Sequence, residues 1–205
     1  MKASQLRKIA AALVAGSAAM AVPQFATAEQ TQVTGAGALS TAAREDFAVV
    51  VPRFLRFRVG TASGTIDQIT FTVPGANVGD STPVAGTGGD AGGGTAANVA
   101  VVGNGGQITI TEANNSTSLG LKHATLAEYI NYSEISTTSS DTTNLQRPVL
   151  SNAGGGTSQP VLNAGNVTNR SAVWTYSYLN TTIPSAGTYG TNANGGRVTY
   201  TAAMP

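Results

Sequence analysis

Residues 172–180 read AVWTYSYLN, residues 181–196 read TTIPSAGTYGTNANGG, and residues 197–205 read RVTYTAAMP. The first and last stretches alternate aromatic or β-branched residues with small polar ones, a pattern typical of half-buried β-strands. The stretch between them is rich in Gly, Asn, Pro and Ser, which favour turns and loops. The three stretches together predict a β-sheet protein.

Three aromatic side chains fall on one face of the first of these stretches: Trp174, Tyr176 and Tyr178. An exposed row of rings would form a platform for stacking a sugar, so these residues are a candidate ligand site. A buried row would instead supply core volume, since each aromatic ring buries about 150–250 Å². The chain has one Trp and few other large apolar residues, which favours the core.

The composition points to a folded all-β domain. Charged residues make up 10% of the chain, against about 25% in an average domain. The Val, Ile, Thr and Tyr residues gather in short runs between Gly/Asn clusters, which is unlike a disordered chain. We predict an antiparallel β-sandwich, Ig-like or jelly-roll-like, with long Gly/Asn/Thr-rich loops. It spans residues 45–205 as one domain, after a flexible tail at residues 29–44.

The N-terminus has the three-part pattern of a secretory signal peptide. Lys2, Arg7 and Lys8 precede an apolar stretch at residues 9–22, and a small-x-small site follows at residues 26–28. The apolar stretch is shorter than the roughly 20 residues of a membrane-spanning helix. We therefore expect residues 1–28 to be removed. The rest would be exported to the periplasm, the cell surface or the medium, without an integral membrane segment.

The charge and the cysteine count exclude several classes of function. Removing the three bases of the predicted signal peptide from 11 leaves 8 against 10 acids, a net charge of −2. That balance gives no electrostatic basis for binding nucleic acid. With no cysteine, the chain forms no disulfide, thiolate zinc site or cysteine nucleophile.

The strongest strand pattern of the first half is FAVVVPRFLRFRV at residues 47–59, with Pro52 dividing it or marking an edge. Beyond Pro52, Leu55, Phe57 and Val59 should face the core, while Arg56 and Arg58 face outward. The arginines either grip an anionic ligand or, as is commoner, stay solvated and discourage edge pairing. A hairpin is expected between this strand and residues 66–74, IDQITFTVP.

The middle of the chain alternates loops with short apolar runs. Residues 75–97 are Gly-rich and predicted to be a surface loop; Asp80 and Asp90 within them suggest calcium, but at no EF-hand spacing. The runs at residues 98–102 and 107–111 flank Asn-Gly-Gly and predict a hairpin. Three further expectations are a short helix or crossover strand at residues 124–135, a polar loop at residues 136–143, and an edge strand at residues 145–150.

The tail contains Val33, Gly35, Gly37 and Leu39, which fall on one side of an extended chain. The simpler interpretation is a disordered terminus. The alternative is a donor strand that pairs with another subunit by β-strand addition.

The pattern of a catalytic site is missing from the sequence. His123 is the only histidine, and no GxSxG motif occurs. Ten Asp and Glu residues always include pairs that could serve glycoside hydrolysis, but no pair has a spacing specific to that chemistry. We therefore expect no enzyme activity, no catalytic or metal-binding residues and no cofactor.

The AGTY sequence at residues 186–189, the VTYT sequence at residues 198–201 and Pro205 resemble the closing hairpin of small bacterial surface β-sandwich modules. These modules include the spore coat protein U-like archaic pilins and the WxL-type surface domain. Unlike pilins, this chain has no cysteine. The resemblance implies a β-sandwich with a surface or fibre role and transfers no binding residue.

Taken together, these observations predict an exported, non-catalytic structural or adhesive surface protein, including a pilus-like fibre subunit that self-associates. The alternative is a secreted carbohydrate-binding module that recognises a surface glycan.

Overall fold

The computed structural model describes residues 31–205. The predicted signal peptide, residues 1–28, lies outside them. The chain divides into two units, residues up to Val50 and the compact unit Val51–Pro205. The compact unit thus begins a few residues after the predicted start at Glu45, because residues 45–50 are exposed and form no strand. Within the described range, no helix is long and apolar enough to cross a membrane.

The compact unit contains strands and short 3-10 helices, and no α-helix. The strands are β1 (Leu55–Val59), β2 (Thr70–Phe71), β3 (Val84–Thr87), β4 (Ala96–Gly103), β5 (Thr109–Asn114), β6 (Leu121–Lys122), β7 (Tyr129–Ile130), β8 (Ile135–Ser139), β9 (Thr157–Ser158), β10 (Thr168–Tyr178) and β11 (Val198–Ala203). The 3-10 helices are η1 (Gly75–Asn77), η2 (Gly92–Gly94), η3 (Tyr132–Glu134) and η4 (Asn192–Asn194). The predicted all-β class is confirmed.

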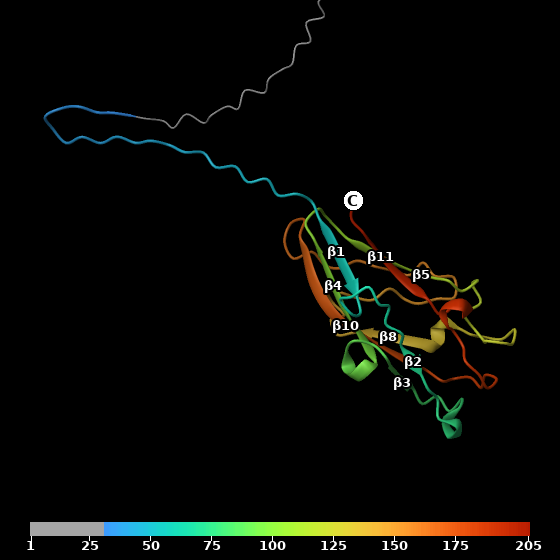
Figure 1. Cartoon of the computed structure of the whole chain (residues 1–205). Helices are drawn as coiled ribbons and strands as arrows, with labels where there is room; N and C mark the ends of the chain where they lie inside the picture. Colours follow the sequence, from blue (N-terminus) through green and yellow to red (C-terminus); the bar gives the residue numbers. More distant parts are fainter. Residues whose placement is uncertain (1–30) are drawn as a thin grey trace, which may run out of the picture. The chain divides into compact units, whose positions relative to one another are not determined.

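The strands form two main antiparallel sheets and a small third one (Figure 1). The first has six strands in the order β1-β4-β10-β3-β2, with β8 also paired to β10. The second has the order β11-β5-β9, and β6 pairs with β7. Each strand pair is antiparallel, as predicted.

Strand β10 is the centre of the larger sheet. It pairs with β4 from Thr168 to Thr175, with β3 at Ser177 and Tyr178, and with β8 from Trp174 to Tyr178. Its buried positions alternate along most of its length, so one face of the strand lines the core. A strand hydrogen-bonded on both sides and buried on one face is the part of a sheet most costly to disturb.

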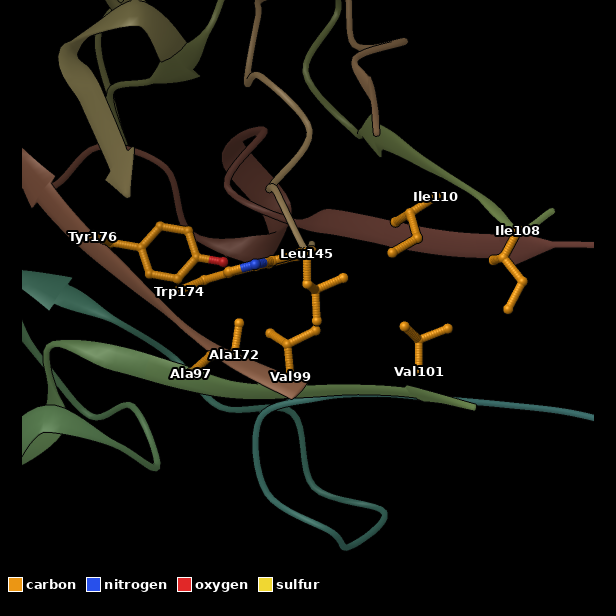
Figure 2. Close-up of a cluster of buried hydrophobic side chains, with 9 residues drawn as sticks. All are labelled: Ala97, Val99, Val101, Ile108, Ile110, Leu145, Ala172, Trp174 and Tyr176. Atoms are coloured by element: carbon orange, nitrogen blue, oxygen red, sulfur yellow. The ribbon is translucent and has the colours of Figure 1, made fainter. Parts of the chain in front are cut away.

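The core lies between the two main sheets (Figure 2). Trp174 of β10 meets Tyr200 of β11 edge-to-face, with ring centroids 5.2 Å apart. Figure 2 labels the buried cluster, which consists of Ala97, Val99, Val101, Ile108, Ile110, Leu145, Ala172, Trp174 and Tyr176. Side chains from both sheets therefore meet in one apolar layer, as expected of a sandwich.

The predicted hairpin of residues 98–102 and 107–111 is wrong. The strands there are β4 and β5, which lie in different sheets. The turn sequence between them makes a corner rather than a hairpin: Val99 and Val101 face the core from one sheet, and Ile110 faces it from the other. Crossing between sheets buries all three side chains against one another, which pairing within one sheet would not.

The predicted hairpin of the first strand with residues 66–74 is also wrong. Strand β1 pairs with β4, and β2 pairs with β3. Strand β3 lies inside residues 75–97, so this Gly-rich stretch is not simply a loop. Its glycines let backbones approach closely, since a Cβ at Gly88 would lie 2.1 Å from the Gln68 carbonyl oxygen.

Three further expectations are corrected or refined. Residues 124–135, expected as a short helix or a crossover strand, contain both the short strand β7 and the short 3-10 helix η3, and the polar residues 136–143 contain most of β8. Residues 145–150 form no strand. Leu145 and Pro148 are fully buried there, so this segment fills the core with its side chains instead of adding a strand to a sheet edge.

Candidate functional site

The most unusual surface of the described chain is an apolar segment just before β1. Phe47, Val49, Val50 and Val51 are 84%, 86%, 92% and 70% exposed. No residue from 31 to 54 belongs to a strand. Contiguous exposed apolar side chains of this size mark interaction sites in soluble proteins. We call residues 47–51 the apolar segment.

The sequence predicts the apolar segment as the first part of a strand, and the structure shows it without a strand partner. The sequence pattern does not reveal that the segment is exposed, because the same pattern is typical of an ordinary core strand. One signal was available: Pro52 separates it from β1, and Glu45 and Asp46 precede it. Such charged and proline boundaries set the segment apart from the continuous strand that follows.

Asn104 anchors the chain where it enters β1. Its side-chain Nδ2 donates to the Pro52 carbonyl oxygen at 2.8 Å, and its Oδ1 accepts from the Phe54 amide at 2.8 Å. Arg53 donates to the Gly105 carbonyl oxygen at 3.1 Å and also bonds the Pro205 carbonyl oxygen. A side-chain amide thus extends the β1–β4 ladder beyond the last residue of β4 and fixes the start of β1.

Strand β1 is an edge strand. It has β4 as its only neighbour in the sheet. Its core-facing residues Leu55, Phe57 and Val59 pack against the core cluster but are only partly buried. Arg56 and Arg58 are exposed, as predicted from their alternation.

Strand β11 is one of the two edge strands of the other sheet, and the two-residue β9 is the opposite edge. The β11 residues Tyr200 and Ala202, with Met204 beyond the strand, pack against the core cluster and are only partly buried. The outward residues Thr199 and Thr201 are exposed and uncharged. Both sheets therefore end in a strand that can accept another one, and only β1 carries charged side chains on its outer face.

The upstream candidate donor strand is exposed but bent. Val33 and Leu39 are 46% and 52% exposed, and the chain bends at residues 36–37. The Thr31 hydroxyl donates to the Ala42 carbonyl oxygen at 2.9 Å across this bend. Val33, Gly35, Gly37 and Leu39 accordingly do not lie along one straight strand here.

The aromatic platform is not formed. Trp174, Tyr176 and Tyr178 are 0%, 8% and 5% exposed. The Tyr176 hydroxyl lies 3.3 Å from the Tyr200 hydroxyl, and burial raises the pKa of Tyr176, Tyr178 and Tyr200. The rings fill the space between the sheets and leave no face for a sugar, so their role as a ligand site is corrected to a core role.

His123 holds a loop in place. Its Nδ1 accepts from the Leu126 amide at 2.9 Å and the Thr125 amide at 3.1 Å, and its Nε2 lies 3.2 Å from the Ala186 carbonyl oxygen. This arrangement corresponds to the neutral ring with its proton on Nε2. A Cβ at Gly187 would lie 1.9 Å from that nitrogen, so glycine is needed there. Both ring nitrogens are thus engaged with backbone groups.

A shallow cavity of about 540 Å³ lies between η3 and the loop before β11. Glu128 and Glu134 line it. Glu128 accepts from the Ser185 hydroxyl at 2.9 Å and the Tyr189 hydroxyl at 3.2 Å, and these bonds, chiefly that from Ser185, lower the pKa of its carboxyl. Thr181 donates to Glu134 through its amide at 3.0 Å. Both carboxylates tie loops together, and the lowered pKa of Glu128 does not suit a general acid.

The aspartates of the Gly-rich stretch have local partners as well. Asp80 accepts from the Asn77 side chain at 2.7 Å and from the Thr82 amide at 2.8 Å. Asp90 accepts from the Asn98 amide at 2.7 Å. Among residues 31–205, no three His, Asp or Glu side chains lie close enough to hold a metal ion. The calcium interpretation gains no support from these contacts.

The chain was compared with family models, curated proteins and solved structures, and none of them matches it.

Proposed function

We propose that this chain is an exported, non-catalytic β-sandwich that acts as a structural or adhesive component of a cell surface by associating with further copies of itself. The observation that carries the proposal is the exposed apolar segment, which precedes in sequence a sandwich whose sheets both end in edge strands. Burying one Val or Phe side chain contributes about 1.5–3 kcal/mol. A chain that keeps four such side chains in water is suited to a partner that covers them.

The sequence supports the location. The N-terminal pattern of a signal peptide favours export, and the lack of cysteine makes folding independent of an oxidising or reducing compartment. The uncharged outer face of β11, with Thr199 and Thr201, suits a component that packs against similar surfaces.

The contacts of the polar groups support a non-catalytic role. His123, Glu128 and Asp80 each bond to nearby backbone or side-chain groups that fix loops. A residue that must exchange a proton with a substrate needs a free atom facing an open site. These side chains instead serve the fold.

The proposal is tested with the protein from residue 29 to residue 205. Size-exclusion chromatography with light scattering and negative-stain microscopy would follow its mass over a range of concentrations. We expect defined oligomers or filaments that increase with concentration. A monomer at every concentration would contradict the proposal.

Two deletions locate the segment responsible. Removing residues 29–39 takes away the upstream donor candidate, and removing residues 29–51 takes away the apolar segment as well. We expect association to survive the first deletion and to be lost in the second. At a dilute concentration where neither protein associates, both should unfold at the same denaturant concentration, because the described part of the deleted stretch contributes nothing to the core cluster.

A further inference from the structure

We propose that the apolar segment of one copy adds as an antiparallel strand to the free edge of β1 in a second copy. The apolar segment of the second copy pairs in the same way with β1 of the first. This inference rests on the proposed self-association and names its partner and its surface. It commits to β1, although β11 is also a free edge, and the reasons lie in the backbone, the side chains and the charges of β1.

The backbone of β1 offers unpaired groups at alternate residues. The Asn104 amide donates to the Phe54 carbonyl oxygen, and the Gly60 amide donates to the Asn98 carbonyl oxygen. The backbone amides and carbonyls of the even-numbered residues of β1 therefore bond to β4, because hydrogen bonding alternates from residue to residue along an antiparallel pair. The amides and carbonyls of Leu55, Phe57 and Val59 then point to the free edge, where an added strand would bond them.

One register matches the side chains on both faces. With Phe47 opposite Phe57, Val49 lies opposite Leu55, and these four side chains face inward, since opposite residues share a face of the sheet. The added pair would cover the partly buried Leu55 and Phe57. On the outer face the same register places Val50 opposite Phe54, which is 48% exposed.

The register also pairs opposite charges. Asp46 lies opposite Arg58 on the outer face, and both side chains are exposed. The two arginines of β1 discourage pairing with uncharged or basic strands, whereas a strand led by an acid is favoured. β11 has no charged residue and offers no such discrimination.

The register is symmetric about Pro52, so each copy donates and receives the same strand. A self-complementary contact of this kind closes as a two-fold dimer. Pro52 has no amide hydrogen, and in this register only odd-numbered residues exchange bonds between the copies. Its even position is therefore compatible with the pairing.

Disulfide trapping tests the pairing directly, because the chain has no cysteine of its own. In the proposed register Ala48 faces Arg56 as a pair without mutual backbone bonds. Such pairs have Cα atoms about 4.5 Å apart, within the range that a disulfide spans. Both side chains are exposed, so Ala48→Cys and Arg56→Cys should leave the core intact. The two single variants, one carrying a tag, would be mixed and oxidised at a concentration where the unmodified protein associates.

We expect one disulfide-linked product containing one copy of each variant, identified by mass spectrometry. Asp46→Cys mixed with Arg58→Cys should give the same result. The comparison mixture, Ala48→Cys with Thr199→Cys on β11, should give little product. Preferential linkage to Thr199→Cys, or no linkage in a protein that still associates, would overturn the inference and leave the proposed function standing. A protein that stays monomeric at every concentration would overturn both.

A charge exchange gives a second measurement that does not depend on cysteine. Asp46→Arg and Arg58→Asp should each weaken dimerisation about tenfold, because each places like charges together at two symmetric positions. The double variant carrying both changes should recover most of the lost affinity. Equal dissociation constants for all four proteins, or no recovery in the double variant, would argue against the register.

Discussion

Residues 47–51 and residues 172–178 are two apolar stretches with opposite environments. The first reads FAVVV and the second AVWTYSY. Val50 in the first is 92% exposed, whereas Trp174 in the second is fully buried. The second stretch lies in β10, which is hydrogen-bonded to β3, β4 and β8, while the first has no strand partner among residues 31–205.

The difference shows that a sequence suited to forming a strand does not by itself determine which strand it pairs with. A run of apolar β-branched residues indicates that a segment is suited to a β-sheet. Which sheet receives it depends on free edges elsewhere, in the same chain or in another. The stability of the compact unit should therefore depend on β10 and the proposed self-association on the apolar segment, and substitutions in the two should separate these properties.

The largest expected effect is on the buried side of this comparison. Trp174→Ala should lower the free energy of unfolding by about 3–5 kcal/mol, because it removes a fully buried ring and leaves a cavity. Denaturant unfolding followed by circular dichroism measures the change. Phe47→Ala is the matched control and should leave the unfolding of the monomer unchanged within about 0.5 kcal/mol. An equal loss of unfolding free energy in both variants would contradict the difference in burial between the two stretches.

A smaller loss is expected where β10 leads into its loop. Asn180 is fully buried with φ 58°, accepts from the Gly79 amide at 3.0 Å and donates to the Asn77 carbonyl oxygen at 2.7 Å. Asn180→Ala should cost about 2 kcal/mol of unfolding free energy, since it removes a fully buried polar side chain and leaves the Gly79 amide without this partner. The same denaturation experiment measures it. A cost below that of a typical surface substitution would show that the loop does not depend on this side chain.

Alkaline pH should unfold the compact unit, because its buried tyrosines must ionise. Burial raises the pKa of Tyr132 to about 12, and it also raises the pKa of Tyr176, Tyr178 and Tyr200. The folded state keeps these phenols protonated when the unfolded chain ionises near pH 10. Their stabilisation is therefore complete below about pH 10 and is lost as the pH rises through the raised folded-state pKa of each phenol, which is about 12 for Tyr132.

Tyrosinate absorbance and unfolding would be followed together from neutral to alkaline pH. Most of the ionisation should coincide with unfolding, and Tyr200→Phe should reduce the pH dependence. Ionisation of all tyrosines near pH 10 in a protein that remains folded would contradict the buried placement of these rings.

The smallest effect on stability is expected from a substitution in the exposed apolar segment. Val49→Asp should change the unfolding free energy of the monomer by less than about 0.5 kcal/mol, because Val49 is 86% exposed. It should nevertheless abolish dimers in sedimentation equilibrium, since the pairing would bury a charge against Leu55. Thr41→Asp, in an exposed position upstream of the segment, serves as the control and should dimerise normally. A Val49→Asp protein that still dimerises would exclude the apolar segment from the contact.

Part of this comparison could be predicted from the sequence. The alternation of Leu55, Phe57 and Val59 with two arginines correctly predicts the two faces of β1, and the scarcity of large apolar residues correctly favours a buried Trp174. These inferences depend on neighbours along one strand, where the period of two fixes the faces.

The pairing of strands could not be predicted in the same way. Asn-Gly-Gly between two apolar runs is compatible with a hairpin and with a corner between sheets, and the choice depends on the volume that Val99 and Ile110 fill together. The Asn104 side chain that continues the β1 ladder, and the approach of Gly187 to His123, join residues far apart in sequence. No local pattern marks such contacts.

Amide hydrogen exchange at two protein concentrations tests the central claim most directly. At a dilute concentration the amides of residues 47–51 and of Leu55, Phe57 and Val59 should exchange rapidly, because none has a strand partner within the described part of the chain. At a concentration where the protein associates, both groups should slow together, and the exchange of β11 should stay the same. Exchange in residues 47–51 that is equally rapid at both concentrations, while the protein associates, would contradict the account.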